Sequence, residues 1–163
     1  MSYPPARYPD ARYLGDGGTA TATLRVAGAA PEVDRAASAA SYLATGASTD
    51  GKFGLYRWDF KGPVSGPQPH FHRSISESFF VLSGTIRLYD GTSWVDGTAG
   101  DFLYVPEGGR HAFRNESGAP ASMLILFAPG APREDYFERV STVGQMSEEE
   151  RTEFFLRHDT FWT

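Results

Sequence analysis

The chain has 163 residues, a formal net charge of −5 and no cysteine. This length suits one domain with one sizeable core, and the lack of cysteine excludes disulfides and thiolate metal ligands. The basic residues are scattered through an acidic chain, which argues against a nucleic acid partner. No apolar run is long enough to cross a membrane and residues 1–10 do not resemble a signal peptide, so we expect a soluble, cytoplasmic protein without a membrane partner.

The N-terminal part of the sequence shows little periodicity. Residues 1–20 mix Pro, Tyr, Arg and Gly, and we expect them to form an arm. The segment TATLRV, residues 21–26, is expected to be a strand. The following segment GAAPEVDRAASAA, residues 28–40, is rich in small residues and is compatible with either a loop or a short helix.

Residues 41 to about 130 contain a series of short extended segments, each closed by Gly, Pro or Asn. No helical pattern separates them, which favours an all-β sandwich or barrel over a parallel sheet. The expected strands lie in SYLATG (41–46), KFGLYRWDF (52–60), SFFVLSG (78–84), TIRLYDG (85–91), SWVDG (93–97), DFLYVPEG (101–108), HAFRN (111–115) and ASMLILFAPG (121–130).

The last part of the chain, about residues 131–163, changes to a helical pattern. Pro132 with acidic residues after it predicts one helix start, and Ser147 with Glu150 forms a capping-box pattern that predicts a second. We expect two short helices whose aromatic residues pack on the strands. Because no repeat or linker interrupts the chain, residues 1–163 are interpreted as a single domain.

Two segments contain candidate metal ligands. In PHFHRSISESFFVLSG, residues 69–84, a strand places His70 and His72 on the same face, with Cα atoms roughly 6.5 Å apart. Glu77 is an odd number of positions from His72, so RSIS must bend for its carboxylate to reach the same face. An isolated H-x-H pattern is also compatible with a solvated pair.

The second segment, GDFLYVPEGGRHAFRN at residues 100–115, places His111 at the start of an expected strand. Three of the four histidines of the chain therefore lie at strand beginnings in these two segments. The fourth, His158, is interpreted as a residue that interacts with the C-terminal dipole of the last helix and not as a ligand.

The two segments together resemble the paired motifs of the cupin family. The pattern G-x5-P-x-G-x2-H-x3-N is matched in full, and H-x-H-x4-E-x6-G is matched from its first histidine onward. One departure is Val64, where the family has a glycine, although glycines lie two positions away on either side. The matching residues are Gly100, Pro106, Gly108, His111 and Asn115 for the first pattern and His70, His72, Glu77 and Gly84 for the second.

This resemblance implies a double-stranded β-helix, a small jelly-roll barrel, with a metal site inside. It implies that His70, His72, Glu77 and His111 bind one divalent transition metal ion, which is Fe, Mn, Ni, Co, Cu or Zn. Glu77 is a candidate general base as well as a ligand. The resemblance also implies a homodimer, in which the N-terminal arm could contact the partner.

Within the family, HAFRNESGAPASMLILFAPG, PREDYF and the C-terminal helices resemble small single-domain cupins similar to quercetin 2,3-dioxygenase. The implied function is metal-dependent oxidation of a small aromatic or enolic substrate by O2. One alternative is a metal-dependent isomerase, cyclase or lyase that does not use O2. Another is a cupin that binds a small molecule without turnover, so whether the protein is an enzyme stays open at this stage.

Overall fold

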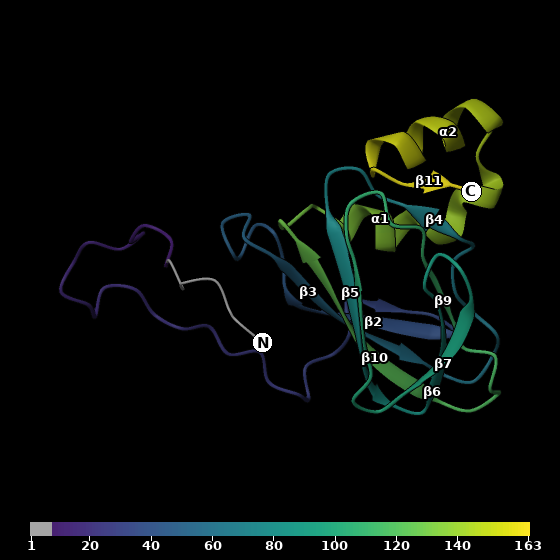
Figure 1. Ribbon diagram of the computed structural model, residues 1–163, viewed down its shortest axis with the longest axis horizontal. Helices are drawn as coiled ribbons and strands as arrows, with labels where there is room; N and C mark the ends of the chain where they lie inside the picture. Colours follow the sequence, from purple (N-terminus) through teal and green to yellow (C-terminus); the bar gives the residue numbers. More distant parts are fainter. Residues whose placement is uncertain (1–7) are drawn as a thin grey trace.

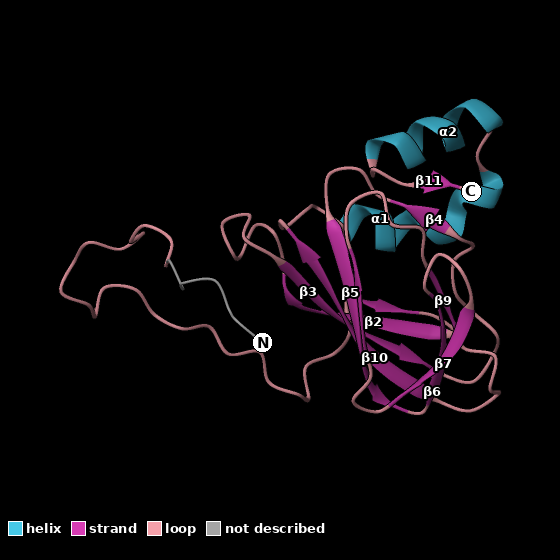
Figure 2. Ribbon diagram, in the orientation of Figure 1, coloured by secondary structure: helices cyan, strands magenta, loops and turns pink. Residues whose placement is uncertain are grey.

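The computed structural model describes residues 8–163, which form two facing β-sheets with helices at one end (Figure 1). The secondary structure is mostly β, and the helices gather beside β4 (His70–Phe71) and β11 (Phe161–Trp162), at the top of the view (Figure 2). The architecture is a double-stranded β-helix of the jelly-roll type, which confirms the fold class predicted from the sequence. No helix in the described part of the chain is long and apolar enough to cross a membrane.

The larger sheet has the strand order β1-β2-β3-β10-β5-β8, with antiparallel neighbours throughout. Its strands are β1 (Val33–Asp34), β2 (Ser38–Ala44), β3 (Gly54–Phe60), β10 (Ala121–Ala128), β5 (Ser76–Ser83) and β8 (Phe102–Val105). Strand β8 is the edge of this sheet and carries the exposed Phe102 and Tyr104. The homodimer expected from the resemblance stays a prediction.

The smaller sheet has the order β7-β6-β9, and a separate two-stranded ladder joins β4 to β11. An isolated bridge between His70 and His111 links the beginning of β4 to the residue before β9. The two candidate-ligand segments are therefore neighbours in space. These strands are β7 (Trp94–Thr98), β6 (Thr85–Tyr89), β9 (Ala112–Arg114), β4 (His70–Phe71) and β11 (Phe161–Trp162).

The core lies between the sheets and is built by alternation along β5 and β10. Every second side chain of β10 is buried, and its partners across the ladder are the buried side chains of β5. This alternation places a carboxylate at the end of an otherwise apolar face. The cross-strand pairs that share this face are Met123 with Val81, Ile125 with Phe79, and Phe127 with Glu77.

The C-terminal part contains the two expected helices, α1 (Glu134–Arg139) and α2 (Glu148–Arg157). The capping box at Ser147 is present, and Phe137 packs edge-on against Tyr56 and Trp58 of the larger sheet. Helix α1 begins two residues after Pro132, with Arg133 as its N-cap. The sequence did not predict the 3₁₀ helix η1 (Val140–Gln145) or β11, because β11 depends on pairing with the distant β4.

Two expectations for the N-terminal part were wrong. TATLRV, residues 21–26, forms no strand: it pairs with no other strand in the described part of the chain, and Leu24 is 84% exposed (Figure 1). A strand needs a neighbour to satisfy its backbone groups, and local pattern does not supply one. The segment 28–40 is neither plain loop nor helix, because it contains β1 and the start of β2. Residues 8–20 are exposed, and residues 1–7 of the expected arm lie outside the described residues.

The departure from the family pattern at Val64 is explained by its neighbours. Gly62 has φ = +118° and Gly66 has φ = +142°, so these residues make the turn before β4. A Cβ on Gly66 would lie 2.0 Å from the Phe113 carbonyl oxygen, whereas Val64 is largely exposed. The close backbone approach of Gly66 to β9 therefore requires glycine.

We predict that Gly66→Ala destabilises the fold by about 2–5 kcal/mol, because it combines a Gly-only conformation with backbone crowding. Gly118→Ala is the matched control, since Gly118 also has a positive φ but has open space around it. Gly118→Ala should lower the free energy of unfolding by about 1–2 kcal/mol, because it adds only the strain of a positive φ and no crowding. Urea unfolding of the two variants measures the difference, and equal losses would contradict a role for crowding.

Candidate metal centre

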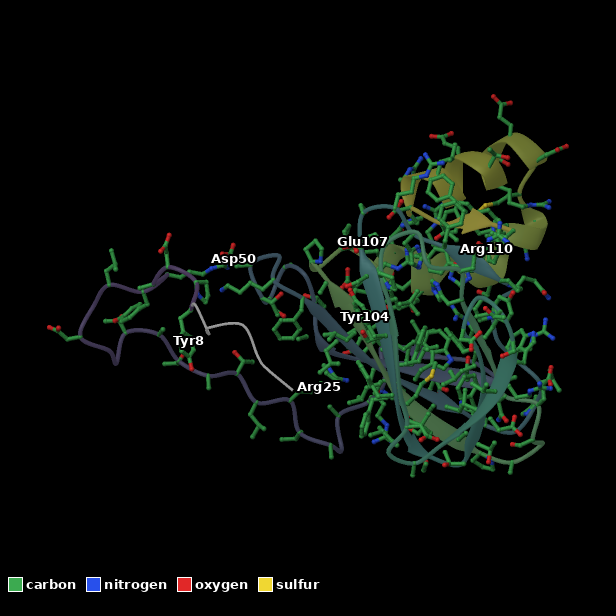
Figure 3. The ribbon with its side chains drawn as sticks, in the orientation of Figure 1. Tyr8, Arg25, Asp50, Tyr104, Glu107 and Arg110 are labelled. Atoms are coloured by element: carbon green, nitrogen blue, oxygen red, sulfur yellow. The ribbon has the colours of Figure 1, made fainter. Side chains whose placement is uncertain are left out.

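The four candidate ligands come from three adjacent backbone segments. His70 begins β4, His72 follows it, Glu77 lies near the start of β5, and His111 precedes β9. The chain bends at Arg73 and Ser74, which turns Glu77 toward the histidines. This is the bend expected from the odd number of positions between His72 and Glu77. The turn at residues 106–110, marked in Figure 3 by Glu107 and Arg110, leads to His111, and its Gly108 amide donates to the His72 carbonyl at 2.7 Å.

These side chains converge on one point inside the fold. One possible ligand atom from each of His70, His72, Glu77 and His111 lies within 4.8 Å of the others, and every residue is at most 4% exposed. The Oε2 atom of Glu77 is 3.0 Å from His72 Nε2 and 2.7 Å from His111 Nε2. The alternative of a solvated histidine pair is therefore excluded by burial.

Each imidazole is oriented by a backbone carbonyl. The Nδ1 atom of His70 contacts Gln68 O at 2.8 Å, that of His72 contacts Asp159 O at 2.6 Å, and that of His111 contacts Gly109 O at 2.9 Å. A carbonyl oxygen only accepts hydrogen bonds, so each Nδ1 carries the proton. In the neutral tautomer Nε2 then presents a lone pair, which is the form that a metal ion binds.

This arrangement leaves the centre of the cluster rich in electrons. Lone pairs from the Nε2 atoms face the Glu77 carboxylate, and the rings of Phe127 and Phe79 pack beside His72 and His111. Acceptors packed this closely need a positive charge between them, supplied either by protons on the imidazoles or by a bound cation. Three imidazoles and one carboxylate suit a divalent transition metal, and the donor set does not choose among such ions.

The directions of the pKa shifts are consistent with positive charge inside the cluster. Burial lowers the pKa of His70 to about 3, so this imidazole stays neutral. Burial alone would raise the pKa of Glu77, but the charge of His111 and the hydrogen bonds from both imidazoles hold it well below its usual range. Burial would lower the pKa of His111, but the Glu77 carboxylate outweighs this and raises it.

A residue of the C-terminal segment stabilises the bend between the ligands. Asp159 accepts hydrogen bonds from the amides of Arg73 and Ser74 and from the Ser74 hydroxyl, at 2.6 to 3.1 Å. Its own carbonyl accepts from His72 Nδ1. Asp159 thus stabilises the bend at Arg73 and Ser74 and also orients His72. No local sequence pattern identified Asp159, because its partners lie more than 80 positions earlier.

The remaining candidates of the sequence analysis lie outside the cluster. His158 is the C-cap of α2, as expected, and its Nε2 contacts Asp135 Oδ2 at 3.0 Å. Asn115 is fully buried and closes the turn after β9 through hydrogen bonds with Ser117 and Ala119.

A cavity of about 250 Å³ opens on the cluster between the sheets and helix α1. His70 and Glu77 form part of its wall, so a bound molecule would meet the candidate metal centre directly. The other side chains are mainly aromatic or apolar, with two arginines. They include Arg35, Trp58, Phe113, Ile125, Arg133, Tyr136, Phe137, Val140 and Trp162.

Comparisons with known proteins agree with the fold. Residues 59–127 match the family described as Cupin domain, which is less than half of the chain but contains all four candidate ligands. No curated protein matches the sequence. The structural neighbours share the fold, and the family match is confined to residues 59–127.

Three structural neighbours illustrate the range of proteins with this fold. KdgF from Halomonas sp. is 13% identical, with 70% of this chain and 99% of that chain covered and a TM-score of 0.61. The polyketide cyclase RemF from Streptomyces resistomycificus is 19% identical, with coverage of 69% and 82% and a TM-score of 0.57. Ectoine synthase from P. lautus is 15% identical, with coverage of 66% and 75% and a TM-score of 0.54. At these identities the likeness shows the fold alone.

We predict that metal binding releases about one proton near pH 6 and weakens as the pH falls. Because the Glu77 carboxylate raises the pKa of His111 above its ordinary value of 6.5, this imidazole carries a proton at pH 6 in the metal-free protein, and the ion must displace that proton. Below this pKa the affinity for Zn²⁺ should fall by about tenfold per pH unit, while above it no proton is released.

Calorimetric titration of Zn²⁺ in buffers of different ionisation enthalpy measures the number of protons. His158→Gln should leave that number unchanged, because this imidazole lies outside the cluster. An affinity that is constant between pH 5.5 and 8 would contradict the assignment of the proton to His111.

We also predict that Asp159→Ala lowers metal affinity by about 10–100-fold, because His72 loses the corner that orients it. Asp159→Asn should have a smaller effect, since Asn tolerates the residue's φ of +49° and keeps one acceptor. Asp101→Ala is the matched control: Asp101 caps the turn before β8 by accepting from Thr98. Competition with a chelating dye measures the affinities, and equal values for Asp159→Ala and Asp101→Ala would refute the role of Asp159.

Proposed function

We propose that this protein is a metal-dependent enzyme that oxidises a small aromatic or enolic molecule with O2, as quercetin 2,3-dioxygenase does. The observation that carries the proposal is the cavity: His70 and Glu77 form its wall, so its contents touch the candidate metal centre. Enclosed, mainly apolar cavities with a few polar groups are the usual binding sites of small molecules.

The proposed ligands are His70, His72, Glu77 and His111, and the proposed cofactor is one ion of Fe, Mn, Ni, Co, Cu or Zn. When bound, such an ion supplies Lewis-acid polarisation of a substrate oxygen and, if redox-active, electron transfer. The protein contributes position and tautomer, because the three carbonyl contacts fix the imidazole rings before any ligand binds.

Glu77 is the proposed acceptor of the substrate's hydroxyl proton. Its low pKa keeps it ionised at neutral pH, and its carboxylate borders the cavity. Transfer of this proton would leave the substrate as an enolate or phenolate, the electron-rich form that O2 oxidises. Both oxygen atoms would enter the product while a carbon bond breaks, so no external reductant is required.

The cavity wall is suited to a flat ring. Trp58 and Phe113 lie edge-on to each other with centroids 6.3 Å apart, and Ile125 contributes apolar surface from β10. Aromatic walls exclude water from a reactive anion and hold planar substrates by stacking or edge contacts.

The second candidate is an isomerase, cyclase or lyase that uses the same base without O2. It is favoured by the donor set itself, because three imidazoles and a carboxylate bind redox-inert Zn²⁺ as readily as redox-active ions. Binding of a small molecule without turnover is the third possibility.

We predict that protein reconstituted with at least one of the redox-active metals Fe, Mn, Ni, Co and Cu consumes O2 when it is mixed with quercetin or with smaller enols such as 3-hydroxychromone. Glu77→Gln should slow this consumption by about 100-fold or more, because the amide cannot accept the proton. Glu107→Gln, the same change on an exposed turn residue, should have no effect. An oxygen electrode gives the rates and elemental analysis gives the metal occupancy.

The outcomes separate the three readings. Conversion of substrate in the absence of O2 with zinc-loaded protein would replace the dioxygenase by the second candidate. Recovery of the ligand unchanged after long incubation would favour binding without turnover. If the rate of Glu77→Gln falls only in proportion to its metal occupancy, then Glu77 acts as a metal ligand and not as a base.

A further inference from the structure

The cavity contains a buried arginine that the proposed chemistry does not use. Arg133 is the N-cap residue of α1, is 3% exposed and forms part of the cavity wall together with Glu77. Arginine is among the residues that are least often fully buried without an ionic partner. Its position is therefore a feature that needs an explanation.

The hydrogen bonds of Arg133 leave most of its donors free. Its Nη1 donates to the His158 carbonyl at 2.7 Å, while its Nε is buried and has no hydrogen-bond partner within residues 8–163. Among the described residues, none of the ion pairs includes Arg133. A guanidinium carries five N–H donors in a planar fork, which matches the two oxygens of a carboxylate.

Aromatic rings support the guanidinium without neutralising it. Its Cζ atom lies 4.2 Å from the centroid of Tyr136, 5.2 Å from that of Phe127 and 5.7 Å from that of Phe137. Cation–π contacts of this kind offset part of the desolvation cost but leave the positive charge in place. The side chain is thus held rigidly at the cavity with its charge uncompensated.

The charge balance of the cavity changes when the cluster holds a metal ion. Burial lowers the pKa of Arg133, and the Glu77 carboxylate is the largest of the nearby charges that oppose this lowering. A divalent ion with three neutral imidazoles and one carboxylate gives the cluster a charge of 2 − 1 = +1. The metal centre and Arg133 would then both be positive, and an anion is the ligand that compensates these two charges.

We propose that the cavity binds an acidic aromatic molecule, with a carboxylate or phenolate group on Arg133 and its reacting oxygen toward the histidine cluster. This inference rests on the proposed function and narrows its substrate to anions. Arg133 is a substrate-binding residue in this scheme, and the ring of the molecule lies between Trp58 and Tyr136, which both belong to the cavity wall.

The test uses cinnamate and its neutral analogue cinnamamide as probes of matched shape. Quenching of tryptophan fluorescence reports binding, because Trp58 and Trp162 belong to the cavity wall. The wild-type protein should bind cinnamate at least about tenfold more tightly than cinnamamide, as expected for a charge-assisted hydrogen-bond pair. Arg133→Met should reduce this ratio to about one.

The variants are chosen so that the protein still folds. Arg133→Met keeps the apolar stem, and the His158 carbonyl retains a hydrogen bond from the Thr160 hydroxyl. If this variant does not fold, Arg133→Lys replaces it, because lysine keeps the positive charge but lacks the planar guanidinium. The ratio of cinnamate to cinnamamide affinity should then fall by about half or more without reaching one. Arg139→Gln removes one charge from the same helix at an exposed position and should leave the ratio unchanged.

Measurements on metal-free and metal-loaded protein separate this inference from the proposed function. A preference for cinnamate in both forms that Arg133→Met abolishes supports the inference, even if no O2 is ever consumed. No preference in the wild-type protein would overturn it. A preference that survives in Arg133→Met, or that depends only on the metal, would also overturn it, because the anion would then be held elsewhere.

Discussion

The structure depends on one electrostatic constraint: three imidazole lone pairs and a carboxylate are directed at the same buried point. Backbone carbonyls at Gln68, Gly109 and Asp159 fix the tautomers, so the rings cannot relieve the crowding by presenting N–H groups without taking up charge. The buried apolar side chains of β5 and β10 continue the face on which Glu77 lies. A site built in this way is stable only with positive charge at its centre, and the fold is arranged to hold that charge in a fixed place.

The scaffold and the cavity use different parts of the chain. The strands supply the ligands and the apolar face, whereas the C-terminal segment closes the cavity and orients one ligand. Helix α1 packs through Phe137 on Tyr56, and β11 pairs with β4 so that Trp162 lies 5.2 Å from the His70 ring. The sheets therefore fix the positions of the candidate ligands, whereas the C-terminal segment shapes the cavity in front of them.

The sequence revealed those parts of the site whose geometry is local. His70 and His72 share a face through strand alternation, and the need for a bend before Glu77 followed from parity alone. The expected strands from residue 41 onward and both helices were present because turn residues and a capping box mark their ends. TATLRV failed as a strand because strand formation needs a partner. Arg133, Asp159 and β11 could not be predicted, since each acquires its role from residues far along the chain.

The contact between His72 and the Asp159 carbonyl has a consequence for the order of folding. All four candidate ligands have been synthesised by residue 111, yet the group that orients His72 comes from the segment after α2. Domains fold in step with synthesis only when their long-range contacts are available. A nascent chain that has emerged to the end of β10 therefore holds all four ligands, but the carbonyl that orients His72 reaches it only when the C-terminal segment docks.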